Sequence, residues 1–155
     1  MFVPTREEED WLRPDPGDRG VRSSSSDERV TVLVVDDHDA FRQAMRDIVV
    51  ATEGFALVGE AVSGEGALAA ASTLSPKLML VDQRMPGMGG VEAARRLAED
   101  HPEVVVVLVS VEEPDVVVQR ACGAAAFLRK HQLCPRVLKD VWRDHGSRDH
   151  GIETG

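Results

Sequence analysis

Five short apolar runs divide the chain, and polar or turn-forming residues bound each of them. A continuous apolar run of about four to eight residues is typical of a β-strand that is buried on both faces. The first run reads Val-Thr-Val-Leu-Val-Val, and the fourth reads Val-Val-Val-Val-Leu-Val. Both are rich in the β-branched residues that strands favour. The strands that we expect are 30–35, 55–61, 77–82, 104–109 and 125–129.

Between these runs, apolar residues recur at helical spacing. In the segment that follows the first strand, Phe41, Met45 and Ile48 fall on one face of a helix. Ser63 is a favourable N-cap for an alanine-rich helix, and Pro135 is favourable in the first turn of the last helix. The helices that we expect are 39–50, 63–74, 90–100, about 114–122, and one that begins near 135.

Strands that alternate with helices indicate an α/β fold with a doubly wound, five-stranded parallel sheet. In this architecture ligands bind beyond the carboxyl ends of the strands. Five polar residues stand at the carboxyl ends of the expected strands, so we expect the sheet to bring them to one edge. These residues are Asp36, Asp37, Asp82, Ser110 and Lys130.

The two ends of the chain differ in character from the middle. Residues 1–29 contain three prolines, a run of four serines and many charges, and such a segment buries too little apolar surface to become ordered. We therefore expect a disordered N-terminal tail at 1–29, a folded domain at 30–145 and a frayed tail at 146–155. Trp11 and Leu12 are the one apolar spot in the first tail, and a short docking segment there is the alternative to a solvated tail.

The net charge of −9 makes direct binding to nucleic acids or anionic membranes unfavourable. The N-terminus lacks the features of a signal peptide, and no apolar run reaches the roughly 18 residues of a membrane span. Two cysteines do not form a secreted disulfide framework. A cytoplasmic protein is the expectation, with Cys122 as a small buried residue.

Three clustered carboxylates raise one another's pKa unless a cation lies between them. A pocket of carboxylate oxygens suits Mg²⁺, so we expect Mg²⁺ as the cofactor. His38 follows the acidic pair, but a single histidine is a weak indication of a metal ligand, and we expect it not to be one.

Phosphoryl transfer explains why a hydroxyl and an ammonium accompany these acids. A carboxylate can attack phosphorus and form an acyl phosphate, and cationic and hydroxyl groups stabilise the phosphoryl oxygens. Asp82 stands alone on the third strand, between the acidic pair and the two other groups, and is the expected nucleophile. Ser110 supplies the hydroxyl and Lys130 the ammonium.

Four segments of the chain resemble the response-regulator receiver domain of two-component systems, in order and at spacings similar to those of the family. The start of the domain is most similar to the receivers of LuxR/NarL-type regulators. The matching segments are Asp36-Asp37, the stretch from Asp82 to Gly90, Val107-Leu108-Val109-Ser110, and the stretch from Gly123 to Lys130.

The resemblance implies a flavodoxin-like sheet with the strand order 2-1-3-4-5. It also implies that Asp82 is the phosphoacceptor, and that Mg²⁺ is held by Asp36, Asp37, Asp82 and the backbone carbonyl of Arg84. Ser110 would bond the phosphoryl group, and Lys130 would form an ion pair with it.

Phe127 matches the aromatic position that turns inward when Ser110 moves, which makes these two residues the expected switch. The partners would be a histidine kinase or phosphotransfer protein and an unknown downstream protein, with a homodimer left open. The protein would act as a stand-alone receiver, and not as an enzyme beyond phosphorylation and dephosphorylation of its own Asp82.

Structural alternatives accompany these roles. Ser110 could cap the next helix, Phe127 could be ordinary core, and Lys130 could be a solvated charge. The stretch from Ser110 to Lys130 is about two residues shorter than the family usually has, and we expect the loss to fall in the fourth helix or the loop that leads to it. Arg84 and Glu112 flank the acceptor position, and we expect them to meet above it.

Three functional alternatives stand beside the switch. The domain could be an interaction module that is never phosphorylated, or a fragment of a DNA-binding regulator. A small phosphatase is disfavoured because Arg84, not an acid, lies two residues after Asp82.

Overall fold

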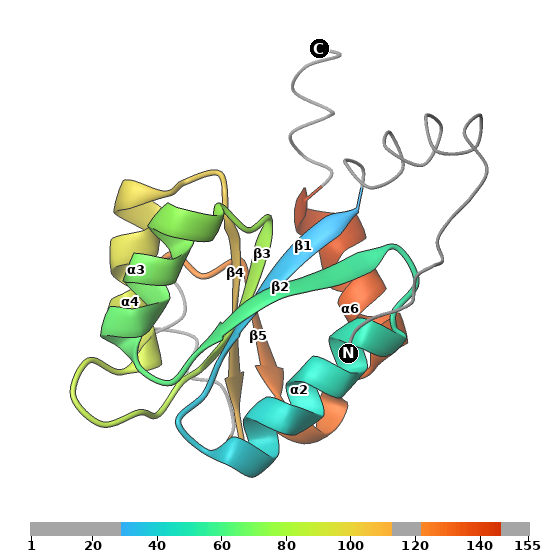
Figure 1. The fold of residues 1–155 in the computed structure, drawn as a ribbon, viewed down its shortest axis with the longest axis horizontal. Coiled ribbons are helices and arrows are strands. Elements are labelled where there is room, and N and C mark those ends of the chain that lie inside the picture. Colours follow the sequence, from blue (N-terminus) through green and yellow to red (C-terminus); the bar gives the residue numbers. More distant parts are fainter. Residues whose placement is uncertain (1–28, 113–121, 147–155) are drawn as a thin grey trace, which may run out of the picture.

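The computed structural model describes residues 29–112 and 122–146. Its five strands form one parallel sheet in the order β2-β1-β3-β4-β5 (Figure 1). The strands are β1 (Val30–Val35), β2 (Phe55–Ala61), β3 (Leu78–Asp82), β4 (Val105–Ser110) and β5 (Ala126–Arg129). The helices are α2 (Asp39–Ala51), α3 (Gly64–Leu74), α4 (Gly90–Asp100) and α6 (Pro135–Val141), with a 3-10 turn η1 (Lys130–Gln132) and a π-helical turn η2 (Trp142–Gly146). The expected sheet and strand order are confirmed.

The expected strands agree with the observed ones to within one residue at each end. Ser110 differs slightly from expectation, because it is the last residue of β4 and not the first residue after it. The expected helix at 114–122 lies outside the described residues except for its last position, as do residues 1–28 and 147–155. Cys122 is buried, as expected.

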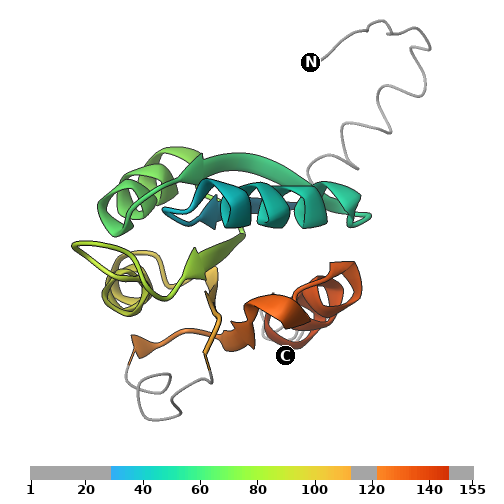
Figure 2. The ribbon, with the colours of Figure 1, turned by 90° about the horizontal axis from the view of Figure 1, so that it is seen from below.

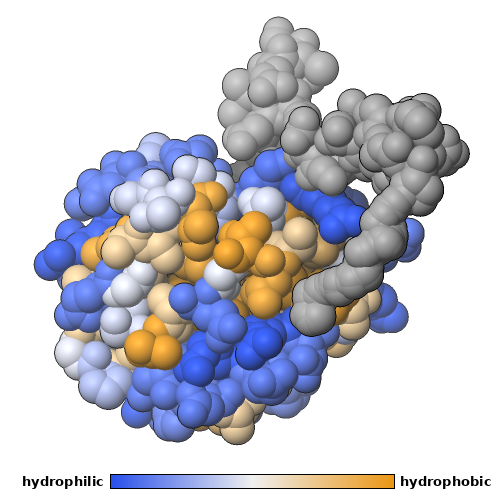
Figure 3. Space-filling model, in the orientation of Figure 1, coloured by the Kyte–Doolittle hydropathy of each residue, from blue (hydrophilic) through white to orange (hydrophobic). Residues whose placement is uncertain are grey.

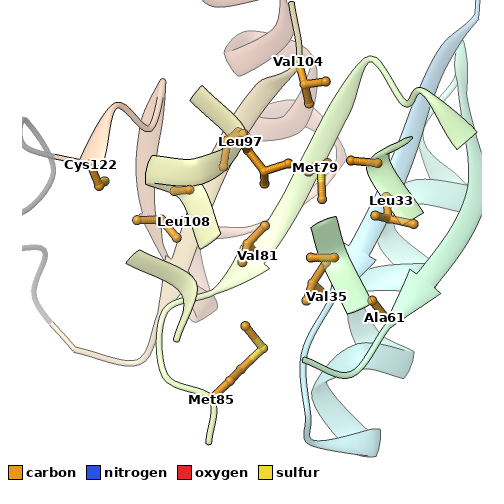
Figure 4. Close-up of a cluster of buried hydrophobic side chains, with 14 residues drawn as sticks. Leu33, Val35, Ala61, Met79, Val81, Met85, Leu97, Val104, Leu108 and Cys122 are labelled. Carbon is orange, nitrogen blue, oxygen red and sulfur yellow. The ribbon is translucent and has the colours of Figure 1, made fainter. Parts of the chain in front are cut away.

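Helices cover both faces of the sheet, with α3 and α4 on one face and α2 and α6 on the other (Figures 1 and 2). Successive strand residues point to opposite faces, so each apolar strand supplies both halves of the core. On the first face, Leu33, Met79 and Leu108 pack against alanines of α3 and α4 (Figure 4). On the other face, Val34 and Leu80 belong to a cluster with Met45, Val49, Leu138 and Val141 of α2 and α6. This double burial explains the continuous apolar runs in the sequence.

Local signals set the ends of several helices. The Ser63 hydroxyl accepts a hydrogen bond from the Gly66 amide at 3.0 Å, which is the expected N-cap of α3. Pro135 is the first residue of α6, where its missing N–H costs nothing. Gly54 has a φ of +87° between α2 and β2, a conformation that side chains disfavour.

The apolar and the hydrophilic parts of the surface lie in different places. Apolar side chains gather over the edge strand β2, whereas hydrophilic residues line the lower edge of the same view (Figure 3). The carboxyl ends of the strands reach that lower edge (Figure 1). Within the described part of the chain, no helix is long and apolar enough to cross a membrane.

Candidate functional site

The parallel register brings the polar residues at the strand ends together. Val35 pairs with Val81, and Asp82 pairs with Val109, so the ends of β1, β3 and β4 lie side by side. Asp36 is fully buried, and Asp82 is 4% exposed. Buried carboxylates are costly unless they are paired, so their partners decide what this edge of the sheet can do.

Lys130 is the cation that joins two of the acids. It begins η1 immediately after β5, and its Nζ lies 3.1 Å from Asp36 Oδ2 and 3.3 Å from Asp82 Oδ1. Its side chain is only 11% exposed. The ammonium is therefore part of a buried cluster and not a solvated charge at the rim.

Asp82 has a perturbed carboxyl group. Burial, and after it the negative charge of Asp36, raises the pKa of Asp82 to about 6, although Lys130 acts in the opposite direction. One ammonium does not compensate for the carboxylates around it. An additional cation or the removal of a negative charge would therefore reduce the electrostatic repulsion between the carboxylates.

The carboxylates are arranged as a cation site would require. One ligand atom each from Asp36, Asp37, His38 and Asp82 lies within 4.8 Å of the others. Both oxygens of Asp36 have partners, since Oδ1 accepts from the His38 amide at 2.9 Å and Oδ2 faces Lys130. Asp37 Oδ1 is buried and has no hydrogen-bond partner among the described residues. An oxygen-rich cluster with an unsatisfied carboxylate oxygen fits Mg²⁺.

His38 adds little to this set as a ligand. Its side chain is 66% exposed, and its Nδ1 lies 3.3 Å from Asp37 Oδ1. An imidazole is not a preferred ligand of Mg²⁺, which favours oxygen. The geometry is that of a histidine that rests against the acidic pair.

The loop between β3 and α4 forms one wall of the site. The Gln83 amide donates to the Val109 carbonyl at 2.8 Å, and the Gly90 amide donates to the Gln83 carbonyl at 2.9 Å. A Cβ on Gly90 would overlap the Asp82 carbonyl, so only glycine allows this approach. Together with Asp37 and His38, the loop lines an open cavity of about 550 Å³.

Arg84 and Glu112 meet at the edge of this loop, as expected. The guanidinium of Arg84 and the carboxylate of Glu112 form an ion pair, and both side chains are more than half exposed. Arg84 also lines the cavity that Asp37 borders. The pair therefore stands at the entrance to the site, where solvent and salt weaken it.

Ser110 and Phe127 occupy neighbouring strands. Ser110 is buried, and its hydroxyl accepts a hydrogen bond from the Glu112 amide at 3.0 Å. The next helix, which Ser110 could cap, lies outside the described residues. Phe127 is half-buried, pairs with Leu108 and packs against the core on the face of α3 and α4. Ser110 precedes and Phe127 follows residues 113–121, which lie outside the described part of the chain.

Two residues of α2 contribute to the site although sequence reasoning gave them no role. The ring of Phe41 lies under the ammonium of Lys130, with 3.6 Å between Nζ and the ring centroid. Arg42 donates to the Asp36 carbonyl at 3.0 Å, to Asp39 at 2.7 Å and to Glu60 at 2.8 Å. Their position one turn after the acidic pair was the only available signal, because Lys130 and Glu60, which they contact, come from distant parts of the chain.

Comparison with known proteins places these features in a family. The response regulator receiver domain matches residues 32–141. The response regulator GacA of Pseudomonas protegens is 44% identical over 103 residues, which cover 65% of this chain and 48% of GacA. The nitrate/nitrite response regulator protein NarL of Escherichia coli is 37% identical over 117 residues, which cover 74% of this chain and 54% of NarL. The chain thus spans about half the length of these curated relatives.

Solved structures agree with this assignment. The receiver domain of the putative response regulator NarL from Mycobacterium tuberculosis has a TM-score of 0.66 and 32% identity, and covers 73% of this chain and 95% of that domain. A CheY-like receiver domain from Methanospirillum hungatei has a TM-score of 0.68 at 23% identity, covering 82% of this chain and 99% of that domain, which supports the fold alone. The chain belongs to the response regulator receiver domain family, with receivers of the GacA and NarL type among its relatives.

Proposed function

We propose that this domain is a phosphorylation switch in which Asp82 accepts a phosphoryl group from a histidine kinase or phosphotransfer protein. The observation that carries the proposal is the buried cluster in which Lys130 lies within 3.3 Å of both Asp36 and Asp82. A structural role does not explain three clustered acids with one cation, since an apolar cluster would be more stable there.

Asp82 is the nucleophile in this proposal. Its carboxylate oxygen forms a bond to phosphorus while the bond from phosphorus to the donor's nitrogen or oxygen breaks, and the departing donor keeps that electron pair and takes up a proton. Lys130 stays beside the oxygens of the transferred group. The pKa of about 6 leaves Asp82 mostly ionised at neutral pH, as a nucleophile requires.

Receiver domains bind Mg²⁺ at an acidic pocket, and the donor set of this chain fits that ion. When bound, Mg²⁺ would neutralise negative charge on the phosphoryl oxygens. Asp37 is the best placed direct ligand because its Oδ1 is unsatisfied and Asp82 lies close to it. The backbone carbonyl of Arg84 would be the further ligand that the family resemblance implies. Asp36 completes the set and also keeps Lys130 in place.

The switch would work through Ser110 and Phe127. The Ser110 hydroxyl would leave the Glu112 amide for a phosphoryl oxygen, and Phe127 would then turn further into the space that Ser110 vacates. A local change of charge would thus bias the segment between them and alter the binding of a downstream protein.

The experiment uses acetyl phosphate and Mg²⁺ with the purified protein. We expect a mass increase of one phosphoryl group on the wild type, none on Asp82→Asn, and none when the metal is chelated. An inert wild type that cannot be distinguished from Asp82→Asn would contradict the switch. That result would favour an interaction module that is never phosphorylated.

Turnover is proposed only for the chain's own aspartyl phosphate. A phosphatase acting on external phosphoesters would need a general acid near Asp82, and Arg84 at that position is paired with Glu112. The stand-alone arrangement stays a prediction, because this chain matches only about half the length of the curated relatives. The mass of the native gene product distinguishes a stand-alone receiver from the receiver of a longer DNA-binding regulator. The domain boundaries at 30 and 145 and the cytoplasmic location also stay predictions.

A further inference from the structure

Lys130 is held from two sides that differ in chemistry. On one side, its Nζ faces the carboxylates of Asp36 and Asp82 at 3.1 and 3.3 Å. On the other side, the same atom lies 3.6 Å from the centroid of the Phe41 ring. A cation above the face of an aromatic ring is attracted by the negative charge of that face. The apolar side chain of Phe41 therefore makes an electrostatic contact with the ammonium.

The surroundings of the ring show why this contact matters. Phe41 and Lys130 border an apolar cavity of about 270 Å³ between α2 and η1. Of the described residues that line this cavity, only Lys130 and His131 carry polar side chains. None of the described residues that line the cavity offers a carboxylate or a hydroxyl to the ammonium. The ring is the group that faces it.

The ring itself is held in place and is not ordinary core. Phe41 is 40% exposed, whereas the residues of α2 that face the core, Met45 and Val49, are nearly or fully buried. His38 lies edge-on to the ring, with 6.4 Å between the ring centroids and an angle of 86°. A half-exposed aromatic residue at this position contributes less by burial than by what its face contacts.

We infer that Phe41 is a positioning residue that keeps the Lys130 ammonium at the phosphoacceptor. This inference rests on the proposed function. When Asp82 becomes phosphorylated and Asp36 and Asp37 turn to a metal, the two carboxylate contacts of Lys130 change. The contact with the ring does not change, because the ring neither titrates nor binds metal. It limits the freedom of a long and flexible side chain.

The test compares substitutions that keep an aromatic face with substitutions that keep only volume. Phe41→Trp and Phe41→Tyr retain the face, whereas Phe41→Leu and Phe41→Met fill the site without it. With acetyl phosphate and Mg²⁺, we expect phosphorylation to slow by roughly two- to thirtyfold in the Leu and Met variants. The Trp and Tyr variants should stay within about twofold of the wild type. Val111→Ala, which lines the same cavity without touching the ammonium, should match the wild type.

A structural effect of the substitution is separated in two ways. In a Lys130→Gln background, Phe41→Leu should cause no further loss, because the cation that the ring holds is gone. In the wild type, NMR should show the Lys130 methylene protons next to Nζ shifted upfield by the ring, and this shift should disappear in Phe41→Leu.

Three results would overturn the inference. These are equal rates for Phe41→Leu and the wild type, an equal loss for the aromatic and aliphatic variants, and the absence of the upfield shift in the wild type. If the wild type itself accepts no phosphoryl group, the proposed function fails. The NMR shift then still reports whether the ring holds Lys130.

Discussion

Replacing Asp82 by asparagine should stabilise the metal-free protein at neutral pH. Asparagine has nearly the same shape as aspartate but carries no charge, so it removes the cost of ionising a carboxyl group that is 4% exposed. Desolvation and the charge of Asp36 raise the pKa of Asp82 to about 6, and Lys130 only partly opposes them. The folded state therefore disfavours the ionised form that chemistry at Asp82 requires.

The size and sign of the effect follow from proton linkage. The pKa of Asp82 is about 6 in the folded protein and 3.8 for an unperturbed aspartate. Between these values the folded state holds more protons than the unfolded state, so the free energy of unfolding falls as pH rises. Below this window both states are protonated and the penalty is absent. Above pH 6 the penalty is complete, and each pKa unit is worth about 1.4 kcal/mol, so Asp82→Asn should add about 2–3 kcal/mol.

Urea unfolding of metal-free wild type and Asp82→Asn, at pH 7.5 and at pH 4, measures this difference. The gain should be present at pH 7.5 and nearly vanish at pH 4. Mg²⁺ should reduce the stability difference between Asp82→Asn and the wild type, because it stabilises the wild type more than the variant. Asp100→Asn removes an exposed carboxylate and is the matched control, expected to change stability by less than about 0.5 kcal/mol. An Asp82→Asn variant that is less stable at pH 7.5 would refute the reasoning, because the carboxylate would then be a net stabilising partner of Lys130.

Other substitutions test the surrounding structure. Arg84→Ala and Glu112→Ala each open the entrance to water, and the phosphoryl adduct should be lost roughly two- to fivefold faster, as an exposed ion pair allows; unchanged lifetimes in both would contradict this role. Gly90→Ala forces a Cβ against the Asp82 carbonyl, and urea unfolding should show a loss of about 1–3 kcal/mol. Arg42→Met keeps the apolar stem but removes the hydrogen bonds that Arg42 donates to three acceptors, and urea unfolding should show a loss of stability of about 1–3 kcal/mol. Unchanged stability would show that water replaces these hydrogen bonds.

The sheet could be predicted because its signal is local. Each central strand is buried on both faces, so a continuous apolar run marks it without knowledge of its neighbours. The caps at Ser63 and Pro135 act within one helical turn and could be placed for the same reason. The parallel arrangement then follows from alternation with helices, and it brings the strand ends to one edge.

The contacts between the side chains at that edge could not be predicted in this way. Lys130 and Asp36 are 94 residues apart, and Arg42 reaches Glu60 across 18 residues. Such pairs depend on strand register and on the direction in which each side chain leaves its element. Phe41 has the helical spacing of a core residue, yet its ring turns to a cation from β5's end. Periodicity predicts which face a residue occupies, but not what that face meets.

The three acids that led to the site are distinguished by their partners. Asp36 has both carboxylate oxygens engaged and its carbonyl held by Arg42, so its position is fixed before any ligand arrives. Asp37 keeps a buried oxygen without a hydrogen-bond partner, which suits a direct ligand of a cation. Asp82 has a single cation at 3.3 Å and a raised pKa, so Lys130 compensates its charge only in part. We propose the acceptor role for Asp82, because Asp36 has both carboxylate oxygens engaged and Asp37 offers its buried oxygen to a cation.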